Sequence, residues 1–178
     1  MNSKKTQDTS LEDVYAKLGQ TLDGLWFLKI EEEFGFDKAL EIDDKVWKIY
    51  GKIEARRLRR FYENLGLLEG KSSLEILDII AGKSLFNKTL SYKTNTSDAN
   101  TLDFIVNGCK TYEGMCKVGR NDQQVHRVCY DIGIAFFDAF AKEIDPSFTV
   151  KCLFTPKTRS EHQDEQGILC GWQFSLQG

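Results

Sequence analysis

Phe148-Thr-Val-Lys-Cys-Leu-Phe154 and the later stretch Ile168-Leu-Cys-Gly-Trp-Gln-Phe-Ser-Leu176 both place large apolar side chains at every second position. Successive side chains of a β-strand point to opposite faces of the sheet. The residues expected to share a core face are Phe148, Val150, Cys152 and Phe154 in the first stretch, and Ile168, Cys170, Trp172, Phe174 and Leu176 in the second. We therefore predict strands over about 148–155 and 167–176, with two cysteines turned toward a hydrophobic core.

The rest of the chain supplies an earlier pair of strands and several helices. Alternating residues at 88–95 and 101–108 flank the turn sequence Ser-Asp-Ala-Asn and predict a β-hairpin. Apolar residues at helical spacing predict helices over about 11–33, from 36 to 65, over 72–82 and over 122–144. An aspartate at 43 or 44 could interrupt the second helix and restart it as an N-cap. Residues 108–121 are expected to form a loop.

This order of elements predicts the fold class. Three helices, a hairpin, a long helix and a second hairpin are typical of an α+β domain with a mainly antiparallel, four-stranded sheet. We expect residues 1–10 to be a disordered N-terminus and residues 11–178 to form a single domain. In the second helix, the residues expected to face inward are Leu40, Val46, Trp47, Tyr50, Ile53, Phe61 and Leu65.

Composition indicates which classes of partner the protein binds and in which cellular compartment it is expected. The 178 residues carry a net charge of −3 and give a pI near 5.5, which offers no basic footprint for nucleic acid. No apolar run reaches the length of a membrane span, and the N-terminus does not resemble a signal peptide. Five cysteines, an odd number, favour reduced thiols over a disulfide framework. We therefore expect a cytoplasmic protein that binds neither nucleic acid nor membranes.

Several segments resemble the signatures of a family of uncharacterised bacterial cytosolic proteins. The segments are Asp23-Gly-Leu-Trp-Phe-Leu28, Glu32-Glu-Phe-Gly-Phe36, Ala39-Leu-Glu-Ile-Asp43, Val46-Trp47, Ile53-Glu-Ala-Arg-Arg57, Phe140-Ala141, Ile144-Asp-Pro146, Cys152, Pro156 and Cys170-Gly-Trp-Gln-Phe174. That family is distantly similar to L-2-amino-thiazoline-4-carboxylate hydrolases. The resemblance implies a hydrolase of a small amide or cyclic amidine, acting through a cysteine or a metal-bound water. The order of elements is also similar to that of the 4-vinyl reductase domain, which implies a small-molecule-binding fold and often a zinc held by cysteines.

The cysteines and histidines are the candidate catalytic groups. No cysteine pair has the short spacing of a zinc knuckle, although Cys109, Cys152 and Cys170 could form a metal site with His162 or a carboxylate. Cys170 and His162 are the candidate catalytic pair, because His162 lies in a polar connection that could fold over the sheet. His126 and Cys129 lie three residues apart on a predicted helix. For most of these thiols, the pattern favours buried hydrophobes over reactive groups. The sequence identifies no cofactor.

The candidate ligand-binding residues are Glu54, Arg57, Arg127 and Trp47. Glu54 and Arg57 flank an apolar stripe within the basic stretch Glu54-Ala-Arg-Arg-Leu-Arg-Arg60, where arginines could grip a carboxylate or phosphate. The alternative for the other arginines is a solvated helix face. Trp26, Trp47 and Trp172 could line an apolar pocket, or belong to the core.

Three functions remain open on this basis. The first is a small-molecule-binding or sensing domain, with a pocket between the C-terminal sheet and the helices. The second is the hydrolase that the resemblance implies, and the third is an interaction protein. The N-terminal helices carry more apolar surface than a small sheet needs, which predicts a homodimer formed through them.

Overall fold

The computed structural model describes residues 10–156 and 167–177. The helices are α1 (Leu11–Phe34), α2 (Phe36–Asn64), α3 (Ser73–Ala81), a 3₁₀ turn (Asn87–Thr89), α4 (Lys110–Lys117), α5 (Asp122–Arg127), a π-helical segment (Val128–Ile132) and α6 (Gly133–Ile144). The strands are β1 (Leu90–Asp98), β2 (Thr101–Cys109), β3 (Phe148–Phe154) and β4 (Cys170–Leu176). The prediction of an α+β fold with an antiparallel sheet is confirmed.

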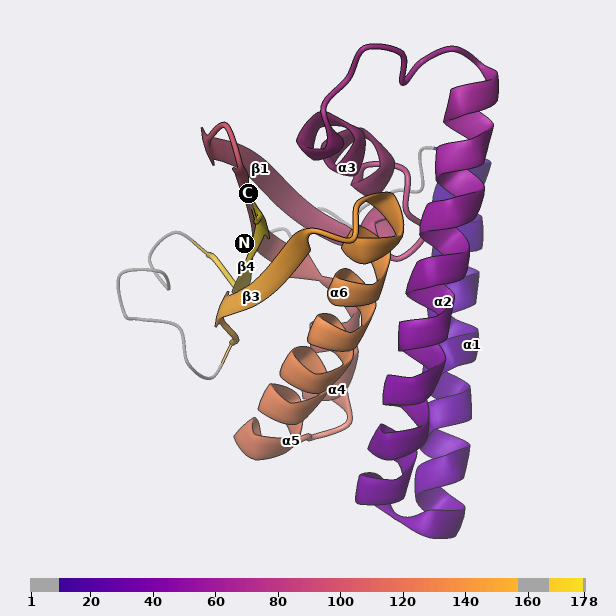
Figure 1. Cartoon of the computed structure of the whole chain (residues 1–178). Helices are drawn as coiled ribbons and strands as arrows, with labels where there is room; N and C mark the ends of the chain where they lie inside the picture. The colour runs from indigo at the N-terminus through magenta and orange to yellow at the C-terminus, as the bar shows by residue number, and fades with distance from the viewer. Residues whose placement is uncertain (1–9, 157–166, 178) are drawn as a thin grey trace.

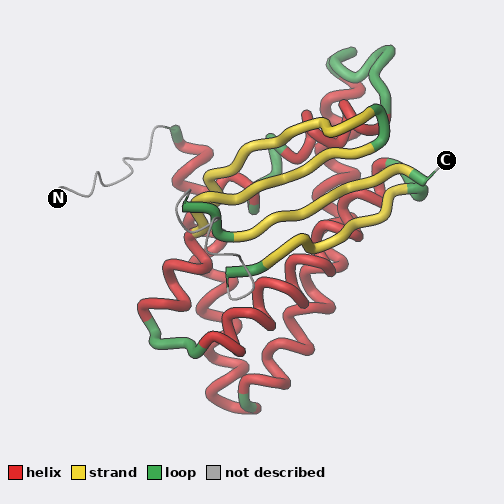
Figure 2. The backbone as a smooth tube through the Cα atoms, turned by 90° about the vertical axis from the view of Figure 1, so that its left-hand side faces the viewer, coloured by secondary structure: helices red, strands yellow, loops and turns green. Residues whose placement is uncertain are grey.

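The elements form layers behind one face of the sheet (Figures 1 and 2). The four strands pair antiparallel in the order β1-β2-β4-β3, so the two hairpins meet through β2 and β4. Helices α3 and α6 cover one sheet face, and the antiparallel pair α1 and α2 packs outside α6 (Figure 1). The opposite face of the sheet turns away from the helices.

Local sequence signals account for the helix ends. Ser10 caps α1, since its side chain accepts a hydrogen bond from the Asp13 N–H at 3.1 Å. Ser72 and Glu75 form a capping box at the start of α3. The predicted interruption of the second helix is wrong, because α2 runs unbroken through Asp43.

The strand parity is confirmed with one exception. Phe148 and Trp172 are buried, as alternation requires. A register shift between Cys152 and Phe154 places Phe154 opposite Gly171. The Phe154 ring therefore contacts the other face of the sheet, where a Cβ on Gly171 would lie 2.6 Å from it. A β-bulge of this kind adds one residue to a strand and reverses the face of those that follow.

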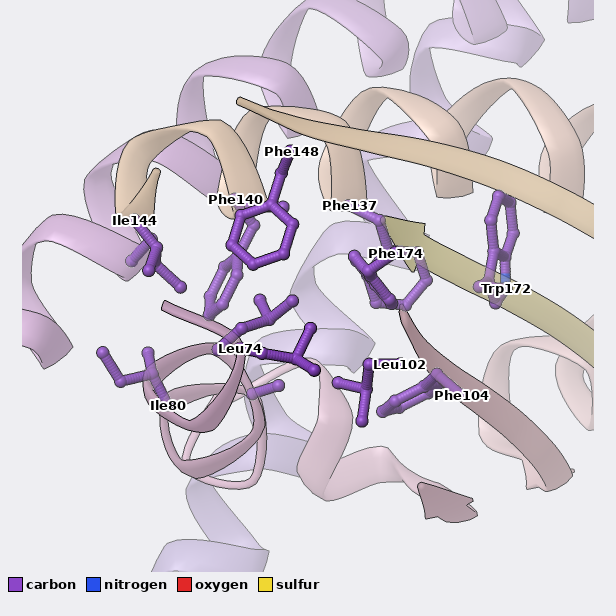
Figure 3. Packing of buried hydrophobic residues seen from close by; sticks show 14 of the residues in the cluster. Leu74, Ile80, Leu102, Phe104, Phe137, Phe140, Ile144, Phe148, Trp172 and Phe174 are labelled. Carbon is purple, nitrogen blue, oxygen red and sulfur yellow. The ribbon is translucent and has the colours of Figure 1, made fainter. Parts of the chain in front are cut away.

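The core lies between the sheet, α3 and α6 (Figure 3). Its aromatic centre comprises Phe104, Phe137, Phe140, Phe148, Trp172 and Phe174, all buried. The Phe137 ring lies 5.1 Å from Trp172 and 5.6 Å from Phe174, within the range of favourable edge and tilted ring contacts. Helix α6 thus carries one apolar face onto the sheet.

The region between β2 and α6 differs from its prediction. The expected loop at 108–121 contains α4, and the predicted helix from Asp122 to Ile144 contains a π-helical segment at its middle. Just after that segment, a Cβ on Gly133 would fall 2.4 Å from the Trp172 ring. Only glycine allows the helix to approach the sheet this closely at that point.

The outer helices expose much of their apolar surface. Val46, Ile53, Phe61 and Leu65 were expected to face inward, yet their exposed fractions are 52%, 39%, 57% and 55%. The inward face of α2 instead uses small residues, because a Cβ on Gly51 would lie 2.8 Å from the Phe136 carbonyl oxygen of α6. None of the helices in the described part of the chain combines the length and the apolar content that a membrane crossing needs.

Candidate ligand-binding pocket

A pocket of about 490 Å³ lies between α1, α2 and the 3₁₀ turn before β1. Its lining residues are Ala16, Gly19, Gln20, Leu22, Asp23, Trp26, Phe27 and Ile30 of α1, Ala39, Ile42, Asp43, Val46, Trp47 and Tyr50 of α2, and Leu85, Phe86 and Thr89. Most of this surface is apolar or aromatic. Both the volume and the lining are typical of small-molecule sites.

Two carboxylates converge on the deep side of this pocket. Asp23 comes from α1 and Asp43 from α2, and the indole N–H of Trp47 lies near both and lowers the pKa of each. Among the residues that the structure describes, neither carboxylate forms an ion pair, and no lysine or arginine lines the pocket. The pocket therefore carries concentrated negative charge within an apolar wall.

Burial and proximity shift the acidity of this pair. Removal from water raises the pKa of Asp23 to about 6. Burial raises the pKa of Asp43 to about 7, and repulsion from Asp23 adds to that shift. The indole N–H opposes both shifts, because it stabilises the ionised forms. The two carboxyl groups thus exchange protons with solvent near neutral pH, which is unusual for aspartate and common at functional sites.

Glu54 lies behind the pocket wall and binds two of the residues that form it. Its buried carboxylate accepts hydrogen bonds from the Tyr50 hydroxyl at 3.1 Å, the Ser84 hydroxyl at 2.8 Å and the Leu85 N–H at 2.6 Å. Burial raises the pKa of Glu54, and these three donors oppose that shift. Because Tyr50 and Leu85 line the pocket and Glu54 does not, this carboxylate positions the wall.

A smaller hollow of about 80 Å³ adjoins the pocket through Asp23, Asp43, Trp47 and Phe86. Three thiols line it, those of Cys109, Cys129 and Cys170. Burial raises the pKa of Cys109, raises that of Cys129 well above its usual value, and raises that of Cys170 to about 12. The π-helical segment supplies Val128, Cys129 and Ile132 to this hollow. Single π-helical turns are frequent at functional sites.

A third hollow, of about 210 Å³, meets the same two aspartates from the side of α4. Arg120 lines it, but its guanidinium is held by the Glu31 carboxylate and lies 5.6 and 5.2 Å from the ring centres of Phe27 and Phe36. This arginine therefore closes one end of the α1–α2 pair and does not neutralise the aspartates.

The structure separates the predicted ligand-binding residues. Trp47 lies in the pocket, and Glu54 lies directly behind its wall. Arg57 is exposed on the outer side of α2, beside a shallow hollow that Arg56 and Arg60 share. Arg127 joins α5 to the start of α2 through its ion pair with Asp37. The pocket also lies between α1 and α2, not between the sheet and the helices as expected.

The predicted catalytic residues do not form a visible pair. His162 lies outside the described residues, so its relation to Cys170 is a prediction only. At a pKa of about 12, the Cys170 thiol keeps its proton at neutral pH and is a weak nucleophile. His126 meets Thr155 at 2.8 Å between Nδ1 and Oγ1 and stacks on Tyr130.

Metal ligands and disulfides are likewise not seen in this part of the protein. All five cysteines are free, with Cys116 exposed and the other four half-buried. Within residues 10–156 and 167–177, no group of three or more His, Cys, Asp or Glu side chains is arranged to hold a metal ion.

Asp23 and Asp43 line the candidate pocket, although the sequence did not single them out as candidate ligand-binding residues. Both fall on inward faces of their helices, since Asp23 is four residues before Phe27, and Asp43 is four residues before Trp47. The signal that could identify them is an acidic residue at a position where the helical pattern expects an apolar one. At position 43, the sequence instead suggested a helix N-cap.

Comparison with known proteins places the chain in a family. A family model described as a family of unknown function, DUF6125, matches residues 2–176, and the chain belongs to that family. No match is found among curated proteins.

The fold is similar to those of several solved structures. One is the crystal structure of the phenol-responsive sensory domain of the transcription activator PoxR with phenol, at a TM-score of 0.59 and 10% identity, covering 96% of this chain and 76% of that one. Another, from work on heme distortion in the H-NOX family, has a TM-score of 0.45 and 10% identity, and covers 100% of this chain and 78% of that one. At this identity the first likeness shows a shared fold.

The comparisons do not support the hydrolase activity that the sequence resemblance implies. The matching family is described as one of unknown function, so it assigns no hydrolase activity to the chain.

Proposed function

We propose that this protein is a small-molecule-binding domain whose ligand occupies the pocket between α1 and α2. One observation carries the proposal: about 490 Å³ of mostly apolar space surrounds a few convergent polar groups, the two aspartates and the indole N–H of Trp47. The volume lies within the range of small-molecule sites, whose walls are likewise mostly apolar and aromatic. Of the residues singled out in the sequence, Trp47 contacts the ligand and Glu54 positions the wall.

The shared fold with the sensory domain of PoxR supports this proposal by analogy. That domain is described as phenol-responsive, and its structure contains phenol. The fold therefore accommodates a small aromatic molecule in at least one protein. Sensing, as opposed to binding alone, would require the ligand to change a surface that a partner contacts.

A neutral aromatic probe tests the pocket directly. We expect 2-phenylethanol or phenol to bind in a calorimetric titration, and Val46→Trp to weaken that binding at least tenfold. Val46 lines the pocket and is 52% exposed, so a tryptophan there can cover the opening.

Leu67→Trp is the matched control. Leu67 follows the end of α2, is 52% exposed like Val46, and does not line the pocket, so its substitution should leave the affinity unchanged. Equal affinity in both variants would place the probe elsewhere. Failure of the neutral probes and of the charged probes described below to bind would refute the proposed function.

We also propose that the protein is a homodimer formed through α1 and α2. On α1, exposed apolar residues recur at alternating intervals of four and three, the spacing of a helix-packing seam; they are Leu11, Tyr15, Leu18, Leu22 and Leu25. Val46, Ile49 and Ile53 extend the apolar surface onto α2. Such a continuous exposed apolar surface is typical of an interaction site.

Charge complementarity favours a second copy as the occupant. Helix α1 carries six acidic and two basic residues, whereas residues 45–60 of α2 carry seven basic residues and one acidic residue. In a two-fold arrangement, α1 of one protomer can lie against α2 of its partner. Leu22, Trp26 and Val46 line the pocket and belong to the exposed surface, so the partner would close the pocket opening.

A further inference from the structure

Resting on the proposed function, we infer that the ligand is an organic cation, an apolar or aromatic molecule with a protonated amine that binds between Asp23 and Asp43. The pocket presents two carboxylates from different helices at one place. Its other polar groups are already engaged: the Tyr50 hydroxyl donates to Glu54, Thr89 donates to the Phe86 carbonyl, and the Gln20 amide donates to Thr111. The polar groups that remain to contact a ligand are the carboxylates of Asp23 and Asp43, whose oxygens accept hydrogen bonds.

A positively charged ligand would stabilise the two carboxylates in this apolar pocket. An ionised carboxylate in an apolar site is unfavourable unless it is paired. Trp47 offers one N–H to two carboxylates, which cannot satisfy both. An ammonium group carries three N–H donors and a positive charge, so it can bridge the two carboxylates.

The aromatic wall favours the same ligand class. Trp26, Phe27, Trp47, Tyr50 and Phe86 all line the pocket. The faces of aromatic rings attract cations, most strongly where water is excluded. Aromatic walls combined with carboxylates thus select cationic ligands over both neutral and anionic ones of the same shape.

Other charges near the pair leave this preference in place. On α2, Asp44 adds negative charge and contributes to the raised pKa of Asp43. From the α4 side, Arg120 is held by Glu31. The thiols of Cys109, Cys129 and Cys170 face the pair from the sheet and the π-helical segment, and their raised pKa values keep them neutral at physiological pH.

The test compares three probes of similar shape by calorimetry at pH 8: phenethylamine, neutral 2-phenylethanol and anionic 3-phenylpropionate. We expect the amine to bind at least tenfold more tightly than the alcohol, and the carboxylate to bind more weakly than either. Lowering the pH to 5 should remove most of the amine's advantage, because both aspartates gain protons while the amine stays charged.

Asp43→Asn provides the decisive variant. It should reduce amine affinity about tenfold or more, and should lower the ratio of amine affinity to alcohol affinity. Asp44→Asn removes the same charge one residue away, outside the pocket lining, and should change neither affinity by more than about twofold.

Each outcome has a separate meaning. Equal binding of amine and alcohol would overturn the cation proposal and leave the pocket's function standing. Amine binding that Asp43→Asn and Asp44→Asn weaken equally would also overturn it, since it would reflect net charge alone. If Asp43→Asn does not fold, loss of the amine preference between pH 8 and pH 5 in the unmodified protein supports the proposal, and its persistence contradicts it.

Discussion

The two sides of α6 face very different environments. Toward the sheet, Phe137 and Phe140 pack among buried aromatic residues, with no charged side chain in the cluster. Toward α2, Phe136 meets Trp47, Tyr50 and Phe86. Immediately beyond these rings lie the open pocket, the half-buried aspartates and the exposed apolar surface of the outer helices.

This difference separates stability from function. Apart from the small hollow beside Cys170, the sheet side is a buried apolar cluster. Burial of that cluster explains why the chain folds. The α1–α2 side departs from a well-packed core in several ways, with unfilled volume, two half-buried carboxyl groups and exposed leucines. Natural proteins concentrate such departures at functional sites. Substitutions on the two sides should therefore have different effects on stability and on binding.

The largest effect on stability is expected from Trp172→Ala. Trp172 is 2% exposed and contacts Phe137 and Gly133, so its removal leaves a large cavity and should cost about 3–5 kcal/mol. Trp26 is 64% exposed, and Trp26→Ala should cost less than about 0.5 kcal/mol while weakening association. Chemical denaturation measures both free energies of unfolding. Comparable losses would mean that α1 belongs to the core after all.

A smaller loss is expected from Glu54→Ala. The substitution leaves the Ser84 hydroxyl and the Leu85 N–H without their acceptor, which should cost about 2 kcal/mol. Hydrogen exchange should accelerate at residues 84–86 and remain unchanged in β2 and β4. Uniform acceleration throughout the chain would show that Glu54 supports the core and not only the pocket wall.

Asp43→Asn, in contrast, should raise the free energy of unfolding at pH 8. The raised pKa means that Asp43 favours folding most below its unfolded pKa of about 4, and that this contribution is lost as the pH rises through about 7. Asn removes the cost of burying the charge, so at pH 8 the variant should gain about 1–2 kcal/mol, allowing for partial exposure. Below about pH 4 the gain should disappear. Asp44→Asn, whose side chain does not line the pocket, should show a much smaller gain.

The smallest change in folding stability is expected from Leu18→Glu. Leu18 is 59% exposed in the middle of the α1 seam, so the substitution should alter the free energy of unfolding by less than about 0.5 kcal/mol, measured at a concentration where the protein is monomeric. The same change should abolish the dimer in light scattering. Val118→Glu, exposed to the same 59% but beyond the end of α4, is the matched control and should leave the dimer intact. A monomer in the unmodified protein at all concentrations would remove the dimer proposal.

Sequence periodicity predicted the sheet well because one of its faces is buried. Alternation at Phe148, Val150, Trp172 and Phe174 can be read directly, since a shift of one residue would expose all of these side chains. The bulge that turns Phe154 to the other face depends on the pairing with β4. The π-helical segment and the helix at 110–117 depend in the same way on tertiary contacts that no local pattern records.

The candidate site was harder to predict than the fold. Trp47 was identified because aromatic residues often line pockets, whereas Asp23 and Asp43 were not singled out, since an acid at a helical position usually faces solvent. Arg57 and Arg127 were candidate ligand-binding residues because of their charge. In the structure, Arg57 is exposed and Arg127 forms ion pairs. The property that defines the pocket is the space between α1 and α2. Helical spacing cannot reveal whether two apolar faces fill that space.

The indole N–H signals of the three tryptophans test the central claim most directly. Trp47 lies deep in the pocket, Trp26 lies at its opening, and Trp172 lies in the sheet core. Two-dimensional NMR during titration with phenethylamine should shift the Trp47 signal most, shift that of Trp26 less, and leave that of Trp172 in place. A titration that moves Trp172 while Trp47 stays still would contradict a ligand site between α1 and α2.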